Sequence, residues 1–358
     1  MKNKRIDDLV CLIKQFKLDY LLIQDPVSID YLIDEMIYPG ERFLGLLLDK
    51  KGNKYLILNK LFYLSKNLDL EILWYFDTDD IIEIISKKIS NNGVFGVDKM
   101  MPAKWLLPLK NILNKMTFVN GSINIDTLRM IKDAQEIDLM RKASKINDQA
   151  ISELIASINS EVTEMELAHQ LEEVYKKYGG EGLSFEPIIA YGRNGADGHH
   201  RPSQNKLQAG DSIVIDMGCY YQGYCSDMTR TVFYKTISKE AKIAYELVKK
   251  ANESAIAMIK PGVKLSDIDY CARNIITEAG YGEFFNHRLG HFIGKEVHEY
   301  GDVSSQFDLK VEEGMIFSIE PGIYIKNQFG IRIEDLVLVT KDGCEVLNNY
   351  PKDLMVLT

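Results

Sequence analysis

The sequence predicts a two-domain protein in which an α/β domain precedes an α+β domain, and three observations support this prediction. The chain has 358 residues, more than the roughly 100–200 residues of a usual domain. Helix-like and strand-like segments alternate over residues 1–123, as is typical of an α/β layer domain. From residue 159 onward, strand-rich blocks stand between pairs of helix-like segments, which indicates an α+β domain with one curved antiparallel sheet.

The first domain, residues 1–123, shows both kinds of periodicity. Apolar residues spaced three and four apart predict helices at 6–16, 26–33, 79–89 and 103–116. Short apolar runs rich in β-branched and aromatic residues predict strands at 20–24, 43–49, 54–59, 71–76 and 93–98. The helix at 26–33 opens with Pro26, which is favourable in a first helical turn.

The rest of the chain is divided into a connector and a second domain. Residues 124–158 are expected to form one long connecting helix, whose apolar stripe runs from Thr127 to about Ile158. The second domain, residues 159–358, is expected to hold helices at 164–179, 238–259 and 265–279. Its strands are expected within 183–235 and 284–340.

Composition excludes several classes of partner. The formal net charge is −9 and no basic run is present, which argues against nucleic acid and against an anionic membrane surface. No stretch approaches the roughly 18 apolar residues of a membrane span, and the N-terminus reads as an amphipathic helix rather than a signal peptide. The five cysteines are odd in number and scattered, which favours a reducing cytoplasm over a disulfide framework.

Acidic and imidazole side chains stand in positions where apolar core is expected. Asp216 and Asp227 interrupt strand-like sequence, and Glu320 and Glu334 do the same further along. Five of the six histidines lie between residues 199 and 298. Each residue alone has a simpler explanation as a cap, a turn or a satisfied core group. Together they are harder to dismiss, because a buried unpaired carboxylate costs several kcal/mol.

A pair of metal ions would explain these buried acids. His291 and the four carboxylates offer mostly oxygen ligands with one imidazole, a set that suits Mn²⁺, Co²⁺, Zn²⁺ or Fe²⁺. Two such ions about 3.5–4 Å apart lower the pKa of a bound water and polarise a carbonyl. The sequence therefore predicts a dinuclear metal site.

The residue order resembles that of the M24 metallopeptidase family, the "pita-bread" peptidases. The family order Asp, Asp, His, Glu, Glu matches Asp216, Asp227, His291, Glu320 and Glu334, at intervals of 11, 64, 29 and 14 residues. The flanking sequences "GYCSDMTRT", "HRLGH", "EPGIYI" and "GIRIED" match as well. Residues 1–123 are similar to the creatinase-type N-terminal domain, so the resemblance covers the whole chain and implies that domain followed by a pita-bread domain.

The resemblance implies a role for each metal-ligating side chain. Asp216 would chelate one ion, His291 and Glu320 would bind the other, and Asp227 and Glu334 would bridge the two. Mn²⁺ is the expected metal, with Co²⁺, Zn²⁺ and Fe²⁺ as alternatives.

The resemblance also implies which groups act on the scissile bond. His199 and His298 would stabilise the tetrahedral intermediate by donating to its oxyanion. Glu320 would carry a proton from a metal-bridging hydroxide to the leaving nitrogen.

Three further residues are expected on the substrate side. His287 would line a proline pocket, and the guanidinium of Arg288 would hold the carboxylate of a dipeptide. Arg332 is grouped with them, and from its place two residues before Glu334 it would also support the metal ligands. The alternative for Arg332 is a plain cross-strand partner.

The implied activity is hydrolysis of the Xaa-Pro bond of dipeptides. Most peptidases fail to cleave this bond, because proline's ring and its missing N–H prevent strand-like substrate binding. An Xaa-Pro aminopeptidase acting on longer peptides is the nearest alternative, and a methionine aminopeptidase has no need of the N-terminal domain. A catalytically inactive binding module of the same fold is the alternative from another class. A proline-containing peptide substrate, a homodimer and a cytoplasmic location complete the expectation.

Overall fold

The computed structural model describes residues 2–358, with side chains from Lys4 onward, and divides into two compact units, Met1–Arg129 and Met130–Thr358. The division falls inside the predicted connecting helix. That segment forms two helices, α5 (Ser122–Met130) and α6 (Ala134–Ala156), so the expectation of one continuous helix is wrong. The second helix begins anew because Asp133 and Glu136 form a capping box.

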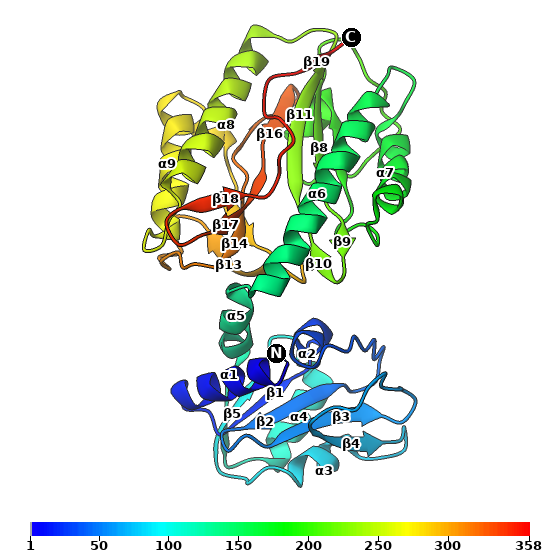
Figure 1. The fold of residues 1–358 in the computed structure, drawn as a ribbon, viewed down its shortest axis with the longest axis vertical. Coiled ribbons are helices and arrows are strands. Elements are labelled where there is room, and N and C mark those ends of the chain that lie inside the picture. Colours follow the sequence, from blue (N-terminus) through cyan, green and yellow to red (C-terminus); the bar gives the residue numbers. More distant parts are fainter. Residues whose placement is uncertain (1) are drawn as a thin grey trace. The chain divides into compact units, whose positions relative to one another are not determined.

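The first unit is a six-stranded mixed sheet with helices on both faces (Figure 1). Its order is β4-β3-β2-β1-β5-β6, antiparallel where β2 meets β1 and β3 and parallel elsewhere. The strands are β1 (Tyr20–Ile23), β2 (Gly45–Asp49), β3 (Lys54–Asn59), β4 (Glu71–Tyr75), β5 (Gly93–Val97) and β6 (Met116–Asn120). The helices are α1 (Lys2–Gln15), α2 (Pro26–Ile33), α3 (Ile81–Ser86) and α4 (Ala103–Ile112). The sequence interpretation missed β6.

Side chains alternate between the two faces of this sheet, as the two-residue period of a strand requires. Leu21 and Leu46 pack with α1 and α2, whereas their neighbours Leu22 and Leu47 pack with α3 and α4. Two separate cores result, one on each face. The predicted α/β layer arrangement therefore describes this unit correctly.

The second unit contains two larger sheets, each covered by a pair of helices (Figure 1). Helices α6 and α7 (Glu164–Tyr178) pack on the sheet β19-β11-β8-β7, and α8 (Lys239–Met258) and α9 (Leu265–Glu278) pack on the sheet β13-β12-β14-β17-β18. The strands of the first sheet are β7 (Ile188–Tyr191), β8 (Ser212–Met217), β11 (Met228–Tyr234) and β19 (Val356–Leu357). Those of the second are β12 (Gly290–Phe292), β13 (Glu299–Val303), β14 (Ile316–Ile319), β17 (Asp335–Val339) and β18 (Cys344–Val346).

Short elements complete the second unit. The pairs β9 (Tyr220–Tyr221) with β10 (Tyr224–Cys225), and β15 (Gly322–Ile325) with β16 (Phe329–Arg332), form two-stranded ribbons. Short 3₁₀ turns lie at Gly192–Ala196 and Gly282–Phe284. The expectation of one curved antiparallel sheet is therefore wrong, because the strands are hydrogen-bonded into two separate larger sheets. Pro321, which has no N–H to donate, separates β14 from β15 where a continuous strand would otherwise run.

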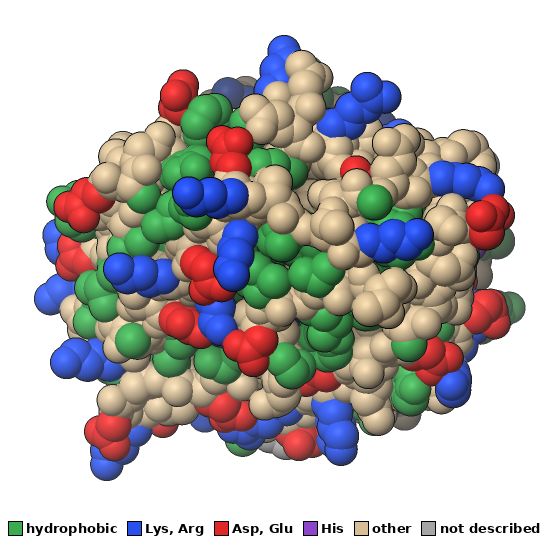
Figure 2. All heavy atoms as spheres, turned by 90° about the horizontal axis from the view of Figure 1, so that it is seen from above, with side chains coloured by type: hydrophobic (Ala, Val, Ile, Leu, Met, Phe, Trp, Pro, Cys, Tyr) green, Lys and Arg blue, Asp and Glu red, His purple; other side chains and the backbone are tan. Residues whose placement is uncertain are grey.

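The surface carries charges of both signs. Figure 2 shows Lys and Arg side chains interspersed with Asp and Glu side chains on the face it presents, rather than gathered into one basic field. Among residues 2–358, none of the helices is both long enough and apolar enough to cross a lipid bilayer.

Candidate active site

A cavity of about 740 Å³ opens in the second unit. All ten residues singled out from the sequence line it: His199, Asp216, Asp227, His287, Arg288, His291, His298, Glu320, Arg332 and Glu334. These residues are spread over 136 positions of the sequence, from His199 to Glu334. They come together because several separate strands end at the cavity. The structure thus brings the complete predicted set together, while the role of each member remains a prediction.

Strand register places the acids of the first sheet at the cavity. Asp216 lies in β8, and Asp227 lies between β10 and β11. Strands β8 and β11 are antiparallel, with Met217 opposite Met228 and Asp216 opposite Thr229. Because Asp227 immediately precedes Met228, both aspartates lie at the same end of this ladder.

The two glutamates lie at the end of another ladder. Strands β14 and β17 are antiparallel, and their pairing ends with Ile319 opposite Asp335. Glu320 follows Ile319 and Glu334 precedes Asp335, so both stand just outside the paired segment. A carboxylate placed there is free of the sheet and available to the cavity.

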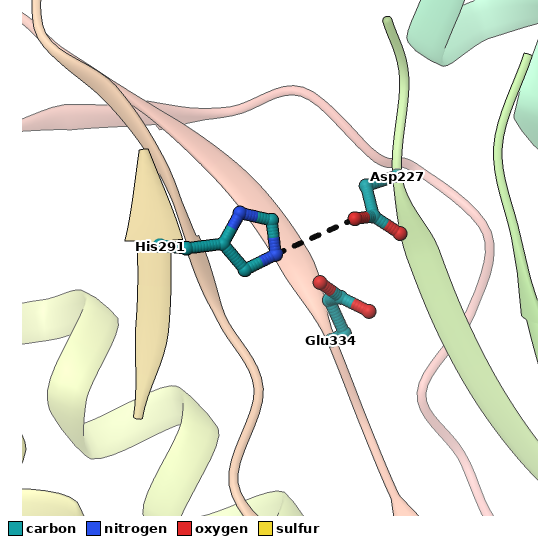
Figure 3. A group of neighbouring side chains, drawn as sticks. All are labelled: Asp227, His291 and Glu334. Atoms are coloured by element: carbon teal, nitrogen blue, oxygen red, sulfur yellow. Dashed lines mark ion pairs between the residues drawn. The ribbon is translucent and has the colours of Figure 1, made fainter. Parts of the chain in front are cut away.

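Asp227, His291 and Glu334 form the most compact group (Figure 3). One potential ligand atom from each lies within 4.8 Å of the others, and all three residues are buried. His291 Nε2 is 3.6 Å from Asp227 Oδ2 and 3.4 Å from Glu320 Oε1. Glu320 therefore borders the same group, while Asp216 lines the cavity beside it.

The protonation of His291 follows from its surroundings. Nδ1 lies 3.2 Å from the carbonyl oxygen of Phe292, a contact that assigns the ring proton to Nδ1. Burial lowers the pKa of His291 to about 3, and His298 and Arg288 add to the effect. The imidazole is therefore neutral, and its Nε2 lone pair faces carboxylate oxygens. A cation between them would satisfy both the lone pair and the carboxylate oxygens.

The carboxylates carry the same signature. Asp216 Oδ1, Asp227 Oδ1 and Glu334 Oε1 are buried and have no hydrogen-bond partner among the described residues. Burial raises the pKa of Asp227 and of Glu334 well above the usual range, and neighbouring carboxylates raise both further. Burial also raises the pKa of Glu320 to about 7. Unpartnered oxygens and repelling charges are what divalent cations would satisfy, so these residues fit a metal centre.

The guanidinium of Arg332 is hydrogen-bonded to residues of the site and is not free in the cavity. Its Nη2 donates to Asp216 Oδ2 at 2.6 Å, and its Nε donates to Thr229 Oγ1 at 3.0 Å. Its Nη1 donates to the hydroxyl of Tyr324 at 2.8 Å. Thr229 Oγ1 in turn donates to Glu334 Oε2 at 2.7 Å. These contacts support the ligand side of the site, and the substrate-binding role predicted for Arg332 remains a prediction.

His287 extends the same network toward the cavity wall. Its Nδ1 is 2.7 Å from the carbonyl of Arg288, and its Nε2 is 3.1 Å from the Tyr324 hydroxyl. With the proton on Nδ1, Nε2 accepts from Tyr324, whose oxygen accepts from Arg332. Burial lowers the pKa of His287 to about 3, which keeps the ring neutral. Phe285 packs edge-on against it, with ring centroids 5.0 Å apart.

The other two histidines occupy different environments. His298 packs edge-on against His291, with ring centroids 4.3 Å apart, and burial lowers its pKa. His199 is exposed at the cavity wall, where its backbone N–H donates to Asp197 Oδ1 at 3.0 Å. Arg288 forms an ion pair with Asp302, which lies opposite His291 in the β12–β13 pairing. That pair partly neutralises the charge proposed to receive a substrate carboxylate.

Several supporting residues were missed by the sequence interpretation. Buried Glu164 accepts hydrogen bonds from His200 and Ser203 on the loop that carries His199. Ser318 accepts from the backbone N–H of His291 and lies 3.1 Å from Glu320 Oε1. In the sequence, Glu164 stands out only as an acidic residue in the first turn of a helix. Such residues are common there without any role in a site.

Comparisons with known proteins agree with this geometry. Residues 138–341 match the metallopeptidase family M24, and residues 5–131 match the creatinase/prolidase N-terminal domain. An uncharacterized peptidase of Staphylococcus aureus (strain MW2) is 37% identical over 337 residues, covering 93% of this chain and 95% of that protein.

Two solved structures are similar to this chain over nearly its full length. A recombinant prolidase from Thermococcus sibiricus is 34% identical with a TM-score of 0.92, covering 100% of this chain and 99% of that one. An X-Pro aminopeptidase from Thermotoga maritima MSB8 is 32% identical with a TM-score of 0.81, covering 95% of this chain and 97% of that one.

Proposed function

Because the chain belongs to the metallopeptidase family M24 and is therefore a hydrolase, we propose that it cleaves the Xaa-Pro bond of dipeptides with two divalent metal ions. One observation carries the proposal. Ligand atoms of Asp227, His291 and Glu334 lie within 4.8 Å of one another in a cavity where three carboxylate oxygens have no hydrogen-bond partner among the described residues.

The proposed metal ligands are Asp216, Asp227, His291, Glu320 and Glu334, with Mn²⁺ as the preferred ion. Bound cations of this kind supply Lewis acidity and a hydroxide nucleophile at neutral pH. The protein holds the ligands in place through the backbone of two sheets, so little rearrangement is needed when the ions bind.

The remaining chemistry is assigned to side chains of this chain. Glu320, with a pKa raised to about 7 by burial, accepts a proton at its carboxylate and passes it to the leaving proline nitrogen. His298 is neutral near pH 7 because burial lowers its pKa, and it donates one N–H to the oxyanion. His199, which is exposed at the cavity wall, is proposed to donate an N–H to the same oxyanion. His287 lines the cavity and, kept neutral by a burial-lowered pKa of about 3, gives the proline ring an uncharged surface, with Phe285 packed against its ring.

Arg288 is the residue proposed to favour dipeptides over longer peptides. Its guanidinium would receive the C-terminal carboxylate, a charge-assisted hydrogen bond of about 1.5–3 kcal/mol. The ion pair with Asp302 weakens that preference, because the incoming carboxylate competes with one already present. This pair is the observation that favours the second candidate, an Xaa-Pro aminopeptidase that accepts peptides extended beyond proline.

One panel of substrates tests the proposal. Xaa-Pro dipeptides, their C-terminal amides and Xaa-Pro tripeptides are assayed with Mn²⁺, Co²⁺ and Zn²⁺. We expect cleavage of dipeptides, and an Arg288→Gln variant whose KM rises about tenfold or more for dipeptides but not for their amides. Efficient cleavage of tripeptides with dipeptides left intact would favour the aminopeptidase. A wild-type protein that binds no divalent metal and cleaves none of these would indicate a binding module.

Two broader expectations remain proposals. Similarity to proteins with this N-terminal domain supports a homodimer, which light scattering on the purified chain tests. All five cysteines are free thiols, which supports a reducing compartment such as the cytoplasm.

A further inference from the structure

A buried asparagine contacts the backbone of both glutamate-bearing segments. Asn252 lies in α8, is fully buried and does not line the cavity. Its Nδ2 donates to the carbonyl of Ile319 at 2.9 Å and to that of Ile333 at 3.4 Å. These are the residues immediately before Glu320 and Glu334. The side-chain amide of Asn252 thus bonds to both segments from outside the cavity.

Lys352 fixes which end of this amide faces the carbonyls. An asparagine side chain can present either its donor or its acceptor to a neighbour, and its contacts decide the orientation. The ammonium of Lys352 is a donor only, and its Nζ lies 2.8 Å from Asn252 Oδ1. Because Oδ1 is held by Lys352, Nδ2 is directed at the carbonyls of Ile319 and Ile333.

Lys352 is itself held by a buried ionic network. Its Nζ is 2.7 Å from Oδ2 of Asp335, a residue with no exposed side-chain surface. Arg230 donates to Oδ1 of the same carboxylate at 2.8 Å and to the carbonyl of Glu334 at 2.6 Å. The network therefore contacts Glu334 through its own carbonyl and through both neighbouring residues.

The place of the glutamates explains why such support is needed. The β14–β17 ladder ends at Ile319 and Asp335, and Pro321 cannot continue it because it has no N–H. Beyond this ladder the N–H of Glu320 donates to the carbonyl of Leu289 and that of Glu334 donates to the carbonyl of Thr229, and the backbone bond between the two segments, from Ile333 to Pro321, is long at 3.4 Å. Ligands of a metal pair must be placed within a few tenths of an ångström, and residues that orient them typically affect metal affinity 10–100-fold.

We propose that Asn252 and Lys352 are positioning residues that hold Glu320 and Glu334 at the separation required to share a pair of divalent ions. Neither side chain reaches the cavity, so their action is through the backbone of Ile319 and Ile333. The inference deepens the proposed function and rests only on its metal-binding part.

The test compares two lysines that join α8 to the same C-terminal segment. Lys352 contacts Asn252, whereas Lys249 pairs with exposed Asp353 at 2.7 Å and reaches neither glutamate. Mn²⁺ binding to the metal-stripped full chain is measured by titration calorimetry without peptide. We expect Lys352→Met to weaken Mn²⁺ binding about tenfold or more and to lower kcat with little change in KM. Lys249→Met, the matched control, should leave both unchanged, and Lys352→Arg should retain most of the affinity.

A second variant guards against a folding defect. Asn252→Ser removes the reach to both carbonyls, and its Mn²⁺ affinity should fall by a similar factor while its unfolding transition in EDTA stays cooperative. Wild-type affinity in folded Lys352→Met and Asn252→Ser, or an equal loss in Lys249→Met, would overturn the inference. A wild-type chain that binds Mn²⁺ but cleaves no Xaa-Pro substrate would contradict the proposed function and leave this inference standing.

Discussion

Arg332 Nη2 donates to Asp216 Oδ2 at 2.6 Å, and both side chains are buried. The bond occupies one oxygen of Asp216 and leaves Oδ1 without a hydrogen-bond partner among the described residues. Arg332 also contacts Thr229 and Tyr324, so one guanidinium orients three groups around the proposed metals. Its planar fork of donors suits this task better than a point charge.

Replacing Arg332 by lysine should therefore impair the site even though the charge is kept. A lysine can contact Asp216 but cannot also donate to Thr229 and Tyr324, so we expect kcat to fall about 10–100-fold with weakened Mn²⁺ binding. Steady-state kinetics and Mn²⁺ titration check this. Arg193→Lys, on the exposed part of the neighbouring 3₁₀ turn, is the control and should match the wild type.

Asp227→Asn should stabilise the metal-free protein while abolishing hydrolysis. Burial, followed by repulsion from Glu334, Asp216 and Glu320, raises the pKa of Asp227, so its charge opposes folding when no cation is bound. Neutralising a buried, uncompensated charge is expected to add about 1–3 kcal/mol to the free energy of unfolding in EDTA. Differential scanning calorimetry at pH 7.5 measures the change. A less stable metal-free variant would contradict the argument, and Asp138→Asn, at an exposed site in α6, serves as control.

Glu164→Gln should disturb substrate turnover without affecting metal affinity. Glu164 Oε1 accepts from the N–H of Tyr191 at 2.7 Å, and Oε2 accepts from Ser203 and contacts His200 Nε2 at 2.8 Å. An amide NH₂ in place of one oxygen would face these donors, so the loop that carries His199 loses part of its support, at about 1–3 kcal/mol.

The expected result for Glu164→Gln is a lower kcat/KM for the dipeptide with wild-type Mn²⁺ binding. Glu166 caps the same helix through Thr163, and Glu166→Gln is the matched control because it contacts that cap and not the loop. If both variants change kcat/KM equally, the effect belongs to the helix and not to the loop.

Asp98→Asn should change how the stability of the first unit depends on pH. Burial raises the pKa of Asp98 to about 6, although backbone N–H groups of Asp25 and Gln24 donate to it at 2.7 Å. The folded state thus binds the proton more tightly than the unfolded state, in which the pKa of Asp98 is 3.8. The stabilisation is fully present below about pH 4 and is lost as the pH rises through about 6.

The wild type should therefore lose about 3 kcal/mol relative to Asp98→Asn between pH 4 and pH 7. Urea unfolding followed by tryptophan fluorescence measures this, because both tryptophans of the chain, Trp74 and Trp105, lie in the first unit. A difference that stays constant with pH, or that grows in favour of the wild type, would contradict the assignment.

The sequence reveals the ligand set because metal binding places acids where core residues are expected. Asp216 and Glu334 interrupt apolar strands, and that conflict is visible without a structure. The support around them is not visible in this way. Arg332 was singled out only through the family resemblance and its place two residues before Glu334. Thr229 and Tyr324 are ordinary strand residues until tertiary structure brings them against the acids.

Secondary structure was predicted well where the periodicity was strong and poorly at interruptions. The helix break at Ile131–Asp133 depends on a cap and on a bridge between Ile131 and Met315, a residue distant in sequence. The separation of β14 from the β15–β16 ribbon falls at Pro321, which reads as a simple turn residue in the sequence. The helix break was missed because it involves a contact distant in sequence, which periodicity does not reveal.

Ser318 lies between two of the proposed ligands, accepting from the N–H of His291 at 3.0 Å and lying 3.1 Å from Glu320 Oε1. Strand β12 can come this close only because residue 290 is glycine, where a methyl group would stand 1.9 Å from the Ser318 carbonyl oxygen. Even alanine there would push the imidazole away from its neighbours. We therefore expect any side chain at position 290 to disturb the packing of β12 against Ser318, so a residue with no chemistry of its own is required for the geometry of the site.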